Sequence, residues 1–178
     1  MRRSRRFSVL CALAVLSGCG WMPGRGDAPT RMPLGGAVVA SPFSPVSMRI
    51  YPLTHAEVGE DGEAILVVFV ELKDQWSDTV KGAGKLELRL ARGGDAAAGG
   101  DAGRRWEIDL ADPDRNAALY DPSTQTYRFA LDGLPGWLAS AVAAGEAMPA
   151  GVWLEAYFRT VGPGGEAEVL RDRFELRR

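Results

Sequence analysis

Cysteine and histidine are nearly missing from this chain of 178 residues. Its two cysteines, Cys11 and Cys19, lie close to the N-terminus, and His55 is its single histidine. No disulfide can form within the chain after Cys19, so a hydrophobic core must hold that part together. A zinc site needs several nitrogen or sulfur ligands, and a Ser-His-Asp triad would have to use His55. Because the nucleophile-elbow pattern G-x-S-x-G is also missing, we predict a protein that is not an enzyme and has no cofactor.

An excess of positive charge is missing as well. The chain has 21 basic and 23 acidic residues, and its first 18 residues hold four arginines and no acid. The remainder therefore has 17 basic residues against 23 acidic ones, a formal charge of −6 with histidine neutral. This balance excludes the basic surface typical of nucleic-acid binding, and it predicts no basic patch for anionic lipid head groups. The sequence GPGG at 162–165 is typical of a hairpin turn and not of a phosphate-binding loop.

The N-terminus lacks a hydrophobic run long enough to cross a bilayer. Arginines at positions 2, 3, 5 and 6 precede about ten apolar residues at 7–16, which is half of what a membrane-spanning helix needs. Leu16-Ser17-Gly18-Cys19 then follows. An aliphatic residue and two small residues let a peptidase approach the backbone closely, and the thiol of the cysteine accepts a diacylglycerol. This arrangement resembles the signal peptide and lipobox of bacterial lipoproteins.

The resemblance covers about the first twenty residues and says nothing about the domain that follows. It implies that residues 1–18 are removed and that Cys19 becomes the first residue, with lipid on its sulfur. Gly20 stands where an aspartate would favour the inner membrane, which implies the outer membrane, on its periplasmic or surface face. Acyl chains on the sulfur bind a bilayer firmly, since each buried methylene contributes about 0.8 kcal/mol. We therefore expect a protein of the bacterial cell envelope that is attached to a membrane through its N-terminal lipid.

Glycine and proline are dense over residues 19–46, and we interpret this segment as a flexible tether. From residue 47 to 178 the pattern alternates with period two, as in half-buried strands. Seven strands are indicated, within SMRIYPLT, AILVVFV, GKLELRLAR, RRWEIDLA, TYRFALD, VWLEAYF and VLRDRFELR. We predict an all-β fold, a single antiparallel sandwich of immunoglobulin-like or C2-like type. One or two short helices are expected, one of them within GLPGWLASAVAAG and the other after Asp112.

Acidic residues between the fourth and fifth of these strands are the candidates for a calcium site. The candidate ligands are Asp112, Asp114, Asn116 and Asp121. The EF-hand pattern fails, however, because Ala117 and Ser123 replace its glycine and its final glutamate. Asp112 can instead cap a short helix that begins with Pro113, and aspartate before Pro122 is typical of a turn. We predict no metal site and keep calcium as the weaker alternative.

Three aromatic residues are the candidates for a ligand or partner site: Trp76, Trp153 and Tyr157. Exposed aromatic rings stack on sugars or anchor protein interfaces, although most aromatic residues are buried for packing. The reading that we favour is a lipid-anchored, non-enzymatic module that binds an envelope protein or glycan or has a structural role. The alternative is a sandwich lipoprotein that binds calcium or a glycan.

Overall fold

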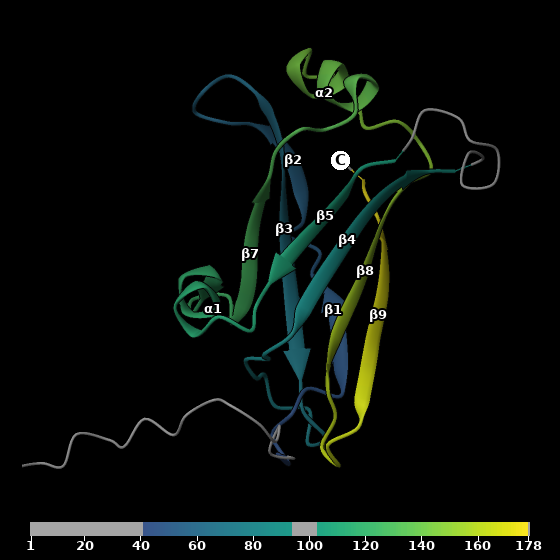
Figure 1. Ribbon diagram of the computed structural model, residues 1–178. Coiled ribbons are helices and arrows are strands. Elements are labelled where there is room, and N and C mark those ends of the chain that lie inside the picture. Colours follow the sequence, from purple (N-terminus) through teal and green to yellow (C-terminus); the bar gives the residue numbers. More distant parts are fainter. Residues whose placement is uncertain (1–40, 94–102, 178) are drawn as a thin grey trace, which may run out of the picture. The chain divides into compact units, whose positions relative to one another are not determined.

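A computed structural model describes residues 41–93 and 103–177 of the chain. Two antiparallel sheets pack face to face, which confirms the predicted all-β sandwich (Figure 1). One sheet contains β1 (Ser47–Ile50), β2 (His55–Val58), β3 (Ala64–Lys73), β6 (Tyr120–Asp121) and β7 (Thr126–Leu131). The other contains β4 (Lys85–Arg92), β5 (Arg105–Asp109), β8 (Val152–Val161) and β9 (Ala167–Glu175). All seven predicted strands are present among the described residues, and the short strands β2 and β6 are additional.

The order of the strands is that of an immunoglobulin-type sandwich. The first sheet has the order β1-β3-β7-β6, and the second has the order β5-β4-β8-β9. Immunoglobulin strands are lettered in chain order, and omitting the short β2 gives the letters A, B, C, C′, D, E, F and G here. In these letters the two sheets have the orders A-B-E-D and C′-C-F-G. The strand order thus favours the immunoglobulin-like of the two predicted types.

The edge of the first sheet is interrupted at Pro52. Strands β1 and β2 pair with opposite ends of β3, and a turn at residues 51–54 separates them. Proline has no N–H to donate to a sheet, so the ladder stops there. The buried hydroxyl of Thr54 accepts a hydrogen bond from the N–H of Phe69 at 3.1 Å and so satisfies the central strand opposite the break. This explains why β1 ends at Ile50, before the end of the predicted segment SMRIYPLT.

Alternating apolar residues of both sheets form one core. Leu86, Leu88 and Leu90 of β4 are at most 1% exposed. Asp172, which shares the inward parity of β9 with Leu170 and Phe174, accepts a hydrogen bond from the N–H of Ile50 on β1 at 2.6 Å. This carboxylate therefore joins the edges of the two sheets, where β1 has no backbone partner on its outer side.

Two short helices cover the connections between strands. Helix α1 (Pro113–Leu119) begins after Asp112, whose carboxylate accepts the N–H of Arg115 at 2.8 Å, as the sequence predicts for a helix cap. Helix α2 (Gly136–Ala143) lies within the predicted GLPGWLASAVAAG segment and buries Leu138 and Ala141. No helix in the described ranges is long and apolar enough to span a membrane.

Candidate functional site

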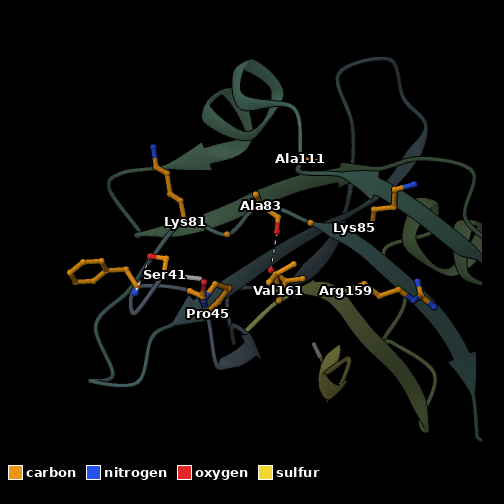
Figure 2. A pocket seen from close by; sticks show the side chains of 13 residues that line it. Ser41, Pro45, Lys81, Ala83, Lys85, Ala111, Arg159 and Val161 are labelled. Carbon is orange, nitrogen blue, oxygen red and sulfur yellow. Dashed lines mark hydrogen bonds between the residues drawn. The ribbon is translucent and has the colours of Figure 1, made fainter. Parts of the chain in front are cut away.

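A pocket of about 560 Å³ lies at the end of the sandwich where β4 begins and β8 ends. The loop Lys81-Gly82-Ala83-Gly84-Lys85 forms one wall, and residues 41–45 and 159–161 form the others (Figure 2). Among the described residues, the thirteen that line the pocket include three cations and no acid: Lys81, Lys85 and Arg159 are the charged ones. Phe43, Pro45 and Val161 give it an apolar surface. The arrangement suits a ligand that carries negative charge beside an apolar part.

The three cations surround the pocket and do not converge on one point. Lys81 and Lys85 extend from the two ends of the loop in different directions (Figure 2). The ammonium group of Lys81 lies 4.4 Å from the ring centre of Tyr120, a cation–π contact that leaves its charge without an acidic partner. Within the described ranges, neither lysine forms an ion pair, and both side chains are exposed. Their charges are therefore accessible to an anionic partner.

Arg159 is held at the pocket by a buried carboxylate. Glu87, on the outer face of β4, is only 1% exposed because the side chains of three arginines cover it. Arg159 and Arg105 contact its carboxylate at 3.0 and 3.1 Å, and Arg89 donates a short hydrogen bond to it. Burial opposes ionisation, but the hydrogen bonds from Arg89 and Arg159 and the attraction of Arg105 outweigh it, so the pKa of Glu87 lies below its ordinary value.

We expect Glu87→Gln to lower the thermal midpoint by roughly 3–6 °C at neutral pH, because the amide leaves three guanidinium groups without their counter-charge. The effect is moderate, because the side chains of these arginines are about half exposed and water can solvate their guanidinium groups in the variant. A lowered pKa means that ionised Glu87 stabilises the fold above the ordinary glutamate pKa of about 4.3, and that this contribution is lost as the pH falls through the folded value.

Thermal unfolding of both proteins at neutral pH and at about pH 3 measures the effect, and the difference between them should disappear in acid. Glu107→Gln is the matched control. Glu107 lies opposite Glu87 on β5 and pairs with Arg105, but its side chain is 68% exposed. Equal losses in the two variants would contradict a special role for the buried carboxylate.

A buried polar network holds the loop of residues 81–85 in place. The side-chain amide of Asn116 donates to the carbonyls of Gly82 and Leu110 at 2.8 and 2.7 Å. Its oxygen accepts the hydroxyl of Tyr127 at 2.9 Å, and this hydroxyl accepts the N–H of Gly82 at 3.0 Å. Burial raises the pKa of Tyr127, although its hydrogen bonds with Gly82 and Asn116 act in the other direction. Helix α1, β7 and the pocket wall are thus fixed to one another.

The acidic candidates from the sequence are engaged locally. The carboxylate of Asp112 caps α1, and that of Asp121 accepts the N–H of Ser123 at 2.8 Å, which lowers its pKa. Asn116 points into the buried network, and Asp114 lies in the first turn of α1. Calcium binding by all four would require the amide of Asn116 to leave that network. In the described part of the chain, no group of three or more His, Cys, Asp or Glu side chains is placed to hold a metal ion.

The aromatic candidates occupy two different places. Trp76 is 56% exposed in the loop between β3 and β4, where its ring lies 5.6 Å from that of Phe43 at the pocket. Trp153 and Tyr157 are half-buried on the outer face of β8, and arginine side chains lie over both rings. The guanidinium of Arg173 is 4.1 Å from the Trp153 ring centre. A sugar that stacked on Trp153 would first have to displace this arginine.

Cys19 lies outside the residues that the structure describes. His55 is exposed at the start of β2, where its ring contacts the Leu53 carbonyl and the carboxylate of Glu57. Sequence reasoning missed the pocket. Its signal in the sequence is KGAGK at residues 81–85, in which a lysine stands at each end and the second lysine begins β4. Folding brings Arg159 to the lining of the same pocket as Lys81 and Lys85, which the overall acidic charge of the chain does not indicate.

Fold and site define an immunoglobulin-type sandwich with a cation-rimmed pocket at one end. Comparison with protein-family models, with curated proteins and with solved structures gives no match.

Proposed function

We propose that this protein is a lipid-anchored, non-enzymatic binding module of the bacterial cell envelope. In this proposal Cys19 carries the lipid, residues 19–46 form the tether, and the sandwich presents the pocket to an anionic envelope component. The observation that carries the proposal is the lining of the pocket, which combines three cations with apolar side chains and includes no acid.

The position of the pocket along the chain also supports the proposal. Residues 41–45 line it, and the segment that precedes them leads directly to the lipobox. The side chains that line the pocket offer charge and apolar surface for binding, and they include no serine–histidine or cysteine–histidine pair for covalent catalysis.

Cys19→Ser should abolish the attachment to the membrane, because serine has no thiol to accept the diacylglycerol. The measurement is detergent phase partitioning of cell extracts, together with the mass of the N-terminal peptide of the wild-type protein. The wild type should enter the detergent phase and carry a diacylglycerol on Cys19, whereas the variant should not. Cys11→Ser is the matched control, since Cys11 lies within the predicted signal peptide, and it should partition like the wild type. A Cys19→Ser protein that still enters the detergent phase would contradict the anchor.

A further inference from the structure

We propose that the pocket end of the sandwich docks on the anionic phospholipid surface of the membrane that carries the lipid anchor. The docking surface consists of two exposed aromatic residues and three cations: Phe43, Trp76, Lys81, Lys85 and Arg159. This inference names the partner of the site in the proposed function and rests on it.

The aromatic pair is the first observation. Phe43 and Trp76 are 63% and 56% exposed, and their rings pack against each other 5.6 Å apart. The loop that carries Trp76 is held rigidly, because the buried carboxylate of Asp74 accepts the N–H groups of Trp76 and Asp78 at 2.9 and 3.0 Å. Rigidly presented aromatic rings beside cations are typical of surfaces that sit at the interface between water and lipid.

The distribution of charge is the second observation. Lys81, Lys85 and Arg159 stand apart around the pocket, an arrangement that fits a surface with many phosphates better than one small anion. The chain after the predicted signal peptide is acidic overall, yet charges beyond about 8 Å are largely screened at physiological salt. Lys81 and Lys85 form no ion pair within the described ranges and are the charges that the proposal places against the bilayer, whereas Arg159 is paired with Glu87 and exposed Asp78 lies in the loop of Trp76.

The length of chain between Cys19 and Ser41 is the third argument. In the proposed function residues 19–40 connect the lipid to the rim of the pocket, and a glycine- and proline-rich tether of that length would have a typical reach of about 25 Å. A short tether gives the sandwich a local concentration near the bilayer on the order of millimolar. Weak contacts are then sufficient for docking, and the proposal places the end that contains residue 41 against the bilayer because the tether joins the sandwich there.

Hydrogen exchange of the lipidated protein in vesicles tests the proposal. The protein is reconstituted in vesicles of phosphatidylcholine alone and of phosphatidylcholine with phosphatidylglycerol. We expect the amides of residues 41–46 and 74–84 to exchange more slowly in the anionic vesicles. The exchange of residues 132–150, which contain α2, should be unchanged. Lys81→Gln with Lys85→Gln should weaken docking about 25-fold, because each lysine near an anionic surface contributes about a fivefold factor.

The control is Arg92→Gln with Arg177→Gln, which removes two exposed charges at the other end of the sandwich. Lys85 and Arg92 are the first and last residues of β4, and Arg177 follows β9 near the start of β8. The control should retain the slow exchange. Equal exchange in both vesicle types, or equal loss of the slow exchange in both double variants, would overturn the docking proposal. An N-terminal peptide that carries diacylglycerol would still support the anchor in that case. An unmodified N-terminal peptide together with slow exchange would support docking and contradict the anchor.

Discussion

Gly84→Ala is expected to lower the free energy of unfolding by about 3 kcal/mol, a large part of the stability of a single domain. A methyl group at this position would lie 2.3 Å from the backbone carbonyl oxygen of Arg159 and 2.9 Å from the ring of Phe158. A carbonyl within β8 cannot move aside without breaking the pairing of β4 with β8. The carbonyl of Gly84 also accepts the N–H of Leu110 at 2.8 Å, so the strain extends to the connection after β5.

Chemical denaturation at neutral pH measures the loss, and Gly136→Ala is the matched control. Gly136 is the first residue of α2, and an added methyl group there has no heavy atom within 4 Å. The same substitution should therefore be neutral or stabilise the protein by up to about 1 kcal/mol, because alanine restricts the unfolded chain. If the two alanine variants had the same stability, close approach of the backbone would not be the reason for glycine at position 84.

Asn116→Ala is expected to cost about 3 kcal/mol and to lower the thermal midpoint by roughly 10 °C. The variant removes two donors and one acceptor at once, so the carbonyls of Gly82 and Leu110 and the hydroxyl of Tyr127 each lose the bond to Asn116, and a longer contact of 3.4 Å between the Tyr127 hydroxyl and the Gly82 carbonyl remains. These groups lie where water has little access, and a buried polar group without a partner costs about 1–3 kcal/mol. Calorimetry of the variant and the wild type measures the change in midpoint.

Tyr127→Phe separates the contribution of the hydroxyl. Tyr127 is 1% exposed, and phenylalanine fills the same space without the bonds to Asn116 and to the N–H of Gly82, so we expect a loss of about 1–2 kcal/mol. In a double-mutant cycle Asn116→Ala should cost less in the Tyr127→Phe protein than in the wild type, by about 1 kcal/mol. Asp114→Ala, in the first turn of the same helix, is the control and should change stability by less than about 1 kcal/mol. Additive losses at positions 116 and 127 would contradict a shared network.

Alternation of apolar and polar residues predicted the sandwich because a strand buries one face, and this preference is local. Leu86, Leu88 and Leu90 are buried as their spacing predicts, and β3 is central as its apolar character on both faces predicts. Helix α1 also followed from local chemistry, since an aspartate before a proline can cap a helix without help from the rest of the chain. The alternation could not predict how the break at Pro52 is compensated. The compensating hydrogen bond joins the hydroxyl of Thr54 to the N–H of Phe69 on a different strand.

The sequence by itself determined the strand pattern, the cap of α1 and the lipobox on which the anchor is proposed. Each of these depends on residues that are close together along the chain. Only the tertiary structure decided the strand order, the covering of Glu87 by three arginines and the pocket beside residues 41–45. Asn116 and Gly82 are 34 positions apart, and Arg159 and Glu87 are 72 apart, so no local pattern indicates that they meet. The pairing of β4 with β8 brings Arg159 and Glu87 together, because a sandwich places strands from distant parts of the chain side by side.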